Sequence, residues 1–322
     1  KSHLLEISPE KPDEVLIQSN KRRVDFFDVY KLNLITNKME LVQKNDKYMG
    51  FVTDDKLNVR FAYLQNEKGE NLLFEKKNGK FKLFDTVPYE DSNTTYIAGF
   101  DKSLDVLYRV DSRDLNTSAL ISQNLKTGDQ DVLGHDDQAD ISGVMIHPTK
   151  RTVQGYANTY TRRKWTITDA SIEADIDHLK SLSDNDFEII SRTLDDSKWI
   201  VAYFSDVEPV SYYLYDTSTR KADFLFVNQE NMKGQPWVHM HPVVIKSRDG
   251  LDLISYLSLP REAVKDAKDI TTTKPVPLIL NVHGGPTARD NWGMDSEHQW
   301  LANRGYAVVS VNYRGSTGIG KD

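Results

Sequence analysis

The sequence contains residue types that could take part in acyl transfer to a serine, but no complete set of them in one motif. Such a reaction needs a nucleophile, a general base, an orienting acid and donors that stabilise an oxyanion. A serine nucleophile on a strand-to-helix elbow lies in the pattern Gly-x-Ser-x-Gly. None of the 17 glycines is followed two places later by serine. Ser316, in residues 314–318 (Arg-Gly-Ser-Thr-Gly), lacks the first glycine, and we interpret it as a loop residue.

The histidines do not suggest a metal site. His239 and His241 flank Met240, so in a strand they would share one face. No nearby carboxylate is well placed as the third ligand that a metal ion would need. His298 falls in a predicted helix beside Trp300, and we interpret it as structural. The chain has no cysteine, which excludes a thiol nucleophile, a disulfide and a cysteine–metal site. We therefore predict no metal and no cofactor.

Length and charge limit the classes of protein further. The 322 residues correspond to about two domains. A net charge of −7 disfavours a nucleic acid or an anionic membrane as partner, and no apolar stretch is long enough for a transmembrane helix. The chain begins Lys1-Ser2-His3, without Met or an apolar leader. We expect either a removed leader or a piece of a longer protein, in the cytoplasm, or in the periplasm if a leader was removed.

A repeat runs through the first three quarters of the chain. Polar turns recur before strand-like runs at intervals of 47 residues, with the markers Ser8, Asp55, Lys102, Thr149 and Asp196. Each unit carries several short strands, and four strands repeated every 40–50 residues are typical of a β-propeller blade. Five such units predict a propeller portion over residues 1–238. An all-β sandwich with chance spacing is the alternative. Residues 171–182 have helical spacing and are predicted to add a helix to the fourth unit.

From about residue 239 the pattern changes to α/β. Residues 243–246 and 251–259 are predicted strands joined by a tight turn at 248–250, and residues 260–275 are predicted to be a surface loop. The apolar run 277–282 is typical of a strand buried on both faces. A helix over 296–304, ended by Gly305, and a strand over 306–311 follow. The order strand, helix, strand predicts a right-handed crossover and a parallel pair.

These residues resemble the start of the catalytic domain in the prolyl oligopeptidase family of serine peptidases. The similarity is greatest to its acylaminoacyl-peptidase and dipeptidyl-aminopeptidase-like branch. The matching runs are 247–251 (Ser-Arg-Asp-Gly-Leu), 281–286 (Asn-Val-His-Gly-Gly-Pro), 302–308 and 312–320 (Asn-Tyr-Arg-Gly-Ser-Thr-Gly-Ile-Gly), with 192–199 similar to the last propeller blade. The resemblance implies a seven-bladed propeller on an α/β-hydrolase domain. We then expect about two further blades before Lys1 and a peptidase domain, 239–322, that stops before the nucleophile elbow.

The resemblance also implies roles for single residues. The nucleophile serine and its aspartate and histidine partners would lie beyond Asp322, so no catalytic triad residue is expected in this chain. Gly284 and Gly285 become candidates for backbone donors to an oxyanion, with His283 beside them. Other branches of the family have tyrosine at the position of His283 and use its hydroxyl, so this sequence departs from that pattern. A simple tight turn is the alternative interpretation of residues 283–285.

The leading hypothesis is therefore a fragment of a serine peptidase that hydrolyses short peptides through an acyl-enzyme. The propeller would restrict substrate access, and the chain alone would be inactive. The alternatives are a propeller scaffold without catalysis and an esterase on the same fold. The expected partners are a short peptide substrate in the intact parent, no nucleic acid and no membrane. The exposed strands of the incomplete hydrolase sheet could also pair with a second copy.

Overall fold

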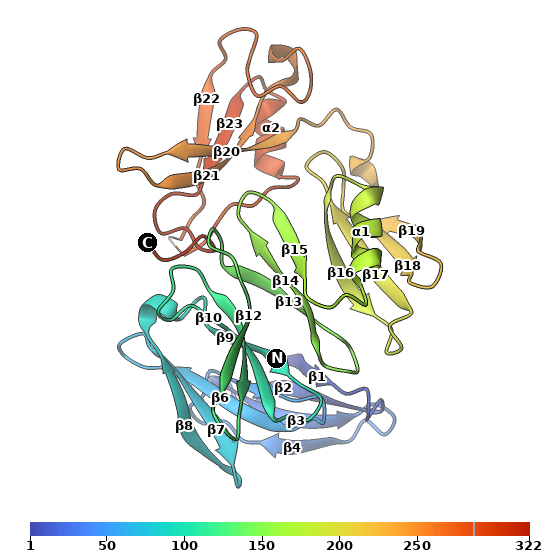
Figure 1. Cartoon of the computed structure of the whole chain (residues 1–322), viewed down its shortest axis with the longest axis vertical. Helices are drawn as coiled ribbons and strands as arrows, with labels where there is room; N and C mark the ends of the chain where they lie inside the picture. Colours follow the sequence, from blue (N-terminus) through green and yellow to red (C-terminus); the bar gives the residue numbers. More distant parts are fainter. Residues whose placement is uncertain (286) are drawn as a thin grey trace. The chain divides into compact units, whose positions relative to one another are not determined.

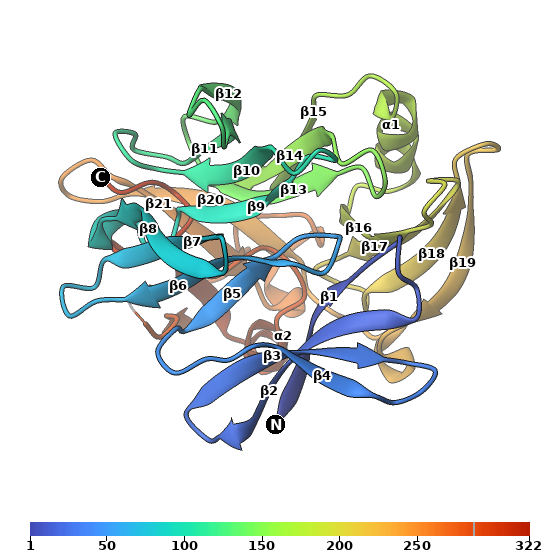
Figure 2. The ribbon, with the colours of Figure 1, turned by 90° about the horizontal axis from the view of Figure 1, so that it is seen from below.

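The computed structural model describes residues 1–285 and 287–322, and it is mostly β, with 45% of residues in strands and 8% in helices. The chain forms two compact units, each treated by itself below (Figures 1 and 2). Unit 1 is Lys1–His135 with Thr149–Arg151, and unit 2 is Asp136–Pro148 with Thr152–Asp322. The predicted domain boundary at 238/239 is a different division, and it stays a prediction.

Unit 1 contains three antiparallel sheets of four strands, each in sequence order. The first holds β1 (Ser2–Ile7), β2 (Glu14–Arg23), β3 (Phe26–Asn33) and β4 (Met39–Gln43). The second holds β5 (Gly50–Thr53), β6 (Val59–Gln65), β7 (Asn71–Lys77) and β8 (Lys80–Val87). After a short 3-10 turn (Tyr89–Asp91), the third holds β9 (Tyr96–Phe100), β10 (Val106–Asp111), β11 (Ala119–Asn124) and β12 (Gln130–His135).

Apolar side chains fill the space between successive sheets of unit 1. Leu16 and Val29 of the first sheet cluster with Phe51 and Ala62 of the second. Phe61 packs toward the third sheet, where its ring stacks on Phe100 with centroids 6.1 Å apart. Burial of such rings is the main favourable contribution to folding. Neighbouring four-stranded sheets packed through apolar side chains are the arrangement of consecutive propeller blades.

Unit 2 begins with two further sheets. One holds β13 (Ile141–Ile146), β14 (Val153–Thr159) and β15 (Arg163–Ile167), and the other holds β16 (Asp186–Arg192), β17 (Lys198–Phe204), β18 (Ser211–Asp216) and β19 (Lys221–Val227). The first of these has three described strands, where the repeat predicts four. The chain forms helix α1 (Glu173–Leu182) after β15 instead, because Ile172, Ile176 and Leu179 recur at helical spacing and are buried.

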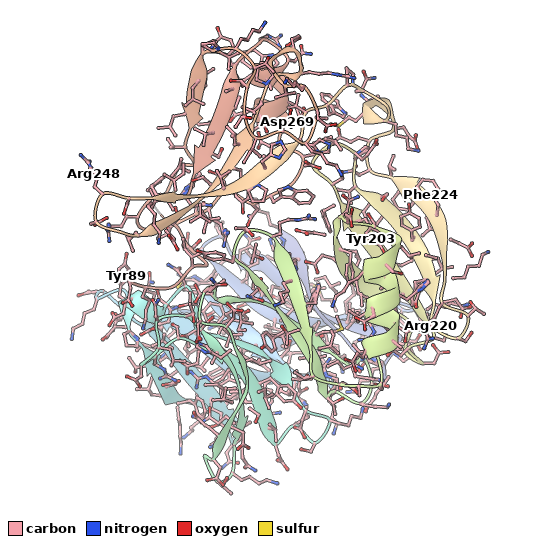
Figure 3. All side chains as sticks on the ribbon, turned by 45° about the horizontal axis from the view of Figure 1, so that its top comes forward. Tyr89, Tyr203, Arg220, Phe224, Arg248 and Asp269 are labelled. Carbon is pink, nitrogen blue, oxygen red and sulfur yellow. The ribbon has the colours of Figure 1, made fainter. Side chains whose placement is uncertain are left out.

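The predicted helix is confirmed as α1, and it packs against the sheet that follows it. Its buried side chains pack in one cluster with Trp199 and Tyr215. Tyr203, labelled beside the helix in Figure 3, donates to the Leu179 carbonyl at 2.8 Å. Tyr215 donates to the buried Asp175 carboxylate at 2.9 Å. These contacts satisfy polar groups that would otherwise be costly to bury.

The repeat is visible in the backbone of the turn between the first and second strands of each later sheet. Leu57, Leu104, Arg151 and Asp196 occupy this turn with φ between 58° and 66°. The first three lie 47 residues apart, as predicted, and the last follows after 45. In the first of these turns, Asp54 Oδ1 accepts from the backbone N–H groups of residues 56 and 58 at 3.1 and 2.9 Å. The acidic residues of the repeat thus act as turn formers.

Unit 2 ends in a mixed sheet with the order β20–β21–β23–β22. Its strands are β20 (Met240–Lys246), β21 (Asp252–Ser258), β22 (Leu278–Asn281) and β23 (Ala307–Val311), with α2 (Ser296–Ala302) in the crossover and 3-10 turns at Glu230–Met232 and Arg261–Ala263. β20 and β21 form the predicted hairpin, whose turn residue Arg248 is labelled in Figure 3. β22 and β23 form the predicted parallel pair. Asp295 caps α2 by accepting from two backbone N–H groups.

One expectation for this sheet was wrong. The run 277–282 was predicted to be buried on both faces, but β22 is the edge strand and exposes one of them. Leu278 and Leu280 are 62% and 61% exposed. Only the opposite face, with Ile279, is partly covered. Within the described residues, no helix is long and apolar enough to span a membrane.

Candidate active site

The loop after β22 carries the two candidate donor glycines. Gly284 and Gly285 are exposed, while the next residue, Pro286, lies outside the described residues. Gly285 has φ +141°, and a Cβ there would lie 2.8 Å from the Thr287 backbone nitrogen. Gly284 has open space around the same position. Glycine is therefore required at 285 by backbone conformation and contact, whereas at 284 a small side chain would fit.

The imidazole of His283 holds this loop. Its Nδ1 lies 2.8 Å from the Gly284 carbonyl oxygen, and its Nε2 lies 2.8 Å from Ser316 Oγ. A carbonyl oxygen only accepts, so Nδ1 carries the proton and Nε2 of the neutral ring accepts from the serine hydroxyl. The ring also stacks on Tyr313 with centroids 4.6 Å apart, and Tyr313 donates to the His283 carbonyl at 3.0 Å.

This anchoring determines where the Gly285 N–H points. In a trans peptide unit the C=O and N–H groups point in opposite directions. Because the Gly284 carbonyl faces the His283 ring, the Gly285 N–H of the same peptide unit points away from that ring. Among residues 1–285 and 287–322, no acceptor is found for the backbone N–H of Gly284 or Gly285. A substrate oxyanion could accept from such a group.

Ser316 and His283 form a serine–histidine pair, but the geometry does not suit a nucleophile and its base. Ser316 is 6% exposed, so its hydroxyl is closed off from a substrate carbonyl. Behind His283, Nδ1 faces a backbone carbonyl and not the carboxylate of a triad. The pair instead fixes the ring that holds the Gly284 carbonyl.

Asn312, which directly follows β23, hydrogen-bonds the backbone of Asp290, a few residues after the loop 283–285. Its side chain accepts from the Asp290 N–H at 2.7 Å and donates to the Asp290 carbonyl at 3.1 Å, and Asn312 is 1% exposed. Burial raises the pKa of the Asp290 carboxyl. Asn312, Tyr313 and Ser316 belong to the run 312–320 quoted for the resemblance, but sequence reasoning gave the first two no role and took Ser316 for a loop residue.

Two other histidines considered in the sequence, His239 and His298, contact polar side chains of the protein. His239 Nδ1 lies 2.9 Å from Asp206 Oδ2, and the rings of His239 and His241 are 6.2 Å apart. The pKa of His241 is lowered, mainly by burial and to a smaller extent by the neighbouring His239. His298 lies between Ser258 Oγ and Ser310 Oγ, at 3.0 and 2.8 Å. In the part of the chain that the structure describes, no group of three or more His, Cys, Asp or Glu side chains is placed to hold a metal ion.

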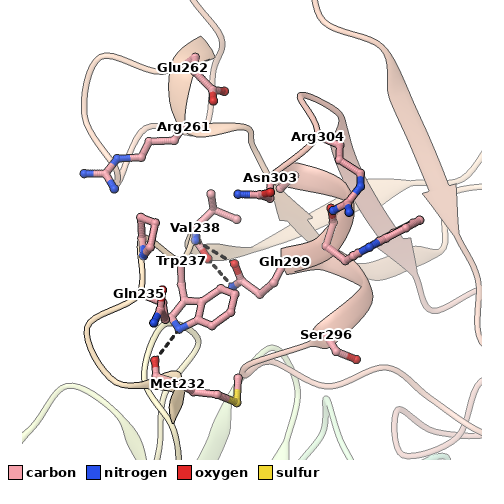
Figure 4. Close-up of a pocket in the computed structure, with 13 residues that line it drawn as sticks. Met232, Gln235, Trp237, Val238, Arg261, Glu262, Ser296, Gln299, Asn303 and Arg304 are labelled. Atoms are coloured by element: carbon pink, nitrogen blue, oxygen red, sulfur yellow. Dashed lines mark hydrogen bonds between the residues drawn. The ribbon is translucent and has the colours of Figure 1, made fainter.

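Unit 2 contains two cavities whose lining does not include the loop 283–285. One, of about 680 Å³, lies against α2 (Figure 4). There Gln299 binds both the N–H and the carbonyl of Val238, at 2.9 and 2.8 Å. The second, of about 450 Å³, is lined by Asp186, Glu188 and Arg289 among others. Burial raises the pKa of both carboxyl groups despite their arginine partners.

A scan against protein-family models finds no match. The chain is 40% identical over 319 residues to dipeptidyl aminopeptidase BIII of Pseudoxanthomonas mexicana, covering 98% of the chain and 46% of that protein. It is 28% identical to dipeptidyl peptidase family member 6 of Caenorhabditis elegans, covering 96% and 45%. The structure of a puromycin-hydrolyzing peptidase of Mycobacterium tuberculosis superposes with a TM-score of 0.64 at 14% identity, covering 100% and 52%.

The packed antiparallel sheets and the mixed sheet with its glycine loop place the chain in the class of propeller-bearing α/β proteins. Within that class, its homologues are dipeptidyl aminopeptidases and peptidases of the prolyl oligopeptidase family, so the resemblance seen in the sequence is confirmed. The chain spans about half the length of the curated relatives it matches.

Proposed function

We propose that this chain contributes the oxyanion-binding loop and part of the propeller to a serine peptidase that cleaves short peptides through an acyl-enzyme. The supporting observation is that the His283 ring binds the Gly284 carbonyl. The Gly285 N–H of the same peptide unit therefore points away from that ring. A preorganised backbone donor of this kind stabilises the tetrahedral intermediates of acyl transfer. The two relatives are named as a dipeptidyl aminopeptidase and a dipeptidyl peptidase family member, and these names support a peptide as substrate.

In this proposal the nucleophile, its base and the orienting acid are supplied by residues other than 1–322. The absence of a Gly-x-Ser-x-Gly run in the sequence supports this, as does the closed geometry around Ser316. The propeller sheets would limit access, so that peptides are cleaved and folded proteins are excluded. Cleavage proceeds by attack of the serine on the peptide carbonyl, release of the amine and hydrolysis of the ester by water.

The test is the intact mass after incubation with a fluorophosphonate probe, which reacts with an activated serine. We expect the 322-residue chain to stay unlabelled at 36.8 kDa. A longer product of the same gene should gain one label and hydrolyse a dipeptidyl chromogenic substrate. Labelling of the 36.8-kDa species would contradict the assignment of the nucleophile. A longer product that neither labels nor hydrolyses would support the scaffold alternative, and one that labels but hydrolyses only esters would support the esterase.

A further inference from the structure

The tip of the β14–β15 hairpin is bound by side chains of the mixed sheet in the same compact unit. Three consecutive backbone carbonyls, those of residues 159–161, accept hydrogen bonds there. Arg289 donates from its two terminal nitrogens to the Thr159 and Tyr160 carbonyls, at 2.8 and 3.0 Å. Tyr256 donates to the Thr161 carbonyl at 2.8 Å. A planar guanidinium spans two adjacent carbonyls in a way that no other side chain reproduces.

A second contact joins the same two segments. The guanidinium carbon of Arg162, at the hairpin tip, lies 3.7 Å from the centroid of the Trp292 ring. Trp292 is itself held by a hydrogen bond from its Nε1 to the Met240 carbonyl at 2.7 Å. Arg162 also pairs with Asp186 at 2.8 Å, within the propeller sheets. The segment that follows Gly285 is thus fastened to the hairpin at two points, residues 289 and 292.

Arg289 also contacts the loop that carries Ser316. A Cβ on Gly318 would lie 2.8 Å from Arg289 Nη1, and Gly318 has φ +87°, so this loop passes directly against the guanidinium. Thr317 N–H donates to the Ala288 carbonyl at 3.0 Å, next to Arg289. A short series of contacts therefore connects the hairpin to Arg289, to the 316–318 loop and, through the Ser316 hydroxyl, to the His283 ring.

We propose that Arg289 is a positioning residue for the oxyanion-binding loop. Through Arg289, the position of the β14–β15 hairpin, which belongs to the propeller portion, determines the orientation of the Gly284–Gly285 peptide. The role of that peptide rests on the proposed function, whereas the mechanical link from residue 159 to residue 285 does not. The link predicts that a change at the guanidinium alters the order of residues 283–285 and 287–290 with little effect on the stability of the sheets.

Hydrogen exchange of the 322-residue chain, read by mass spectrometry, tests the link. Arg289→Lys keeps the charge but replaces the planar guanidinium, which donates from two separate nitrogens, with a single nitrogen on a flexible stem. We expect exchange of the hydrogen-bonded amides next to the guanidinium, those of Asp290 and Thr317, to become about tenfold faster, as for the loss of one charge-assisted hydrogen bond. Exchange in β16–β18 should stay unchanged. Arg304→Lys is the matched control, because Arg304 also donates to a backbone carbonyl, at 2.9 Å, but lies just after α2.

A second variant perturbs the same link from the other side. Gly318→Ala places a methyl group against the guanidinium and should produce the same localised pattern. Unchanged exchange of the Asp290 and Thr317 amides in both variants would overturn the proposal. Equal acceleration throughout the unit would also overturn it, because that result indicates a merely structural role. Fluorophosphonate labelling of the longer product separates the two proposals. Arg289→Lys should slow labelling there, whereas a product that never labels contradicts the proposed function and leaves the exchange result standing.

Discussion

His298 is a buried titratable group whose ionisation should be visible in the stability of unit 2. It is 1% exposed on α2 and bridges Ser258 of β21 and Ser310 of β23. Burial lowers the pKa of His298 below its usual value, with Asp295 and Glu297 opposing the shift. Neutral imidazole has one donor and one acceptor nitrogen, so each serine hydroxyl can complement it.

The direction and size of the pH effect follow from this geometry. The unfolded chain takes up a proton on His298 near pH 6.5, whereas the folded chain resists it. The stabilising contribution is therefore complete above about pH 6.5 and is lost as the pH falls toward the lower folded pKa. If the ring stays neutral in the fold, the free energy of unfolding decreases by about 1.4 kcal/mol at pH 5.5 through this one group.

The assay is urea unfolding at pH 7.5 and 5.5. At each urea concentration, a short hydrogen-exchange pulse at one constant pH is applied, and mass spectrometry of peptides from α2 and β23 gives the unfolded fraction. His298→Gln removes the titrating group and serves as the reference, so other acid-sensitive groups, including His241, cancel in the comparison. We expect the wild-type chain to lose about 1.4 kcal/mol more than the variant between the two pH values. Equal losses in both proteins would refute the reasoning.

Three further predictions concern the loop and its sheet. Asn312→Ala removes the acceptor of the Asp290 N–H and one of the two donors to the Asp290 carbonyl, the other being Arg289 Nε at 3.3 Å, and should destabilise unit 2 by about 1–3 kcal/mol in urea unfolding. Gly285→Ala should slow fluorophosphonate labelling of the longer product at least tenfold, while Gly284→Ala, with open space around it, should change the rate less than twofold; the reverse order would contradict the assignment of the donor. Leu280→Thr should change the stability of the 322-residue chain by less than about 0.5 kcal/mol, because Leu280 is largely exposed, whereas Ile254→Thr, fully buried, should cost about 2–3 kcal/mol.

Much of the fold could be predicted from the sequence because its signals are local. The acidic turns recur with the strands they connect, and a turn depends on a few neighbouring residues. The apolar spacing of Ile172, Ile176 and Leu179 predicted α1. The strand–helix–strand order predicted the parallel pair of β22 and β23. What the spacing did not predict is the three-stranded sheet before α1, because the distance between the turns, 45 residues across α1, stays close to 47 whether a strand or a helix lies between them.

The candidate site was only partly predictable. The glycines of the loop were found from their place after a strand, and His283 from its place beside them. Ser316 looked like a loop residue, and its role appears only when the fold brings it 2.8 Å from a ring 33 positions away. Asn312 and Arg289 carry no local signal of their function. Arg289 reaches carbonyls 130 positions earlier in the chain, a relation that no short motif encodes.

The sequence by itself therefore determined the repeat, the change to α/β after residue 238 and the family resemblance, because backbone preferences and motif residues act over a few positions. The tertiary structure alone decided that His283 binds the Gly284 carbonyl, that the Gly285 N–H points away from the His283 ring and that β22 exposes one face. These depend on which groups from distant segments meet, and on the hydrogen bonds that buried polar groups must then make with one another.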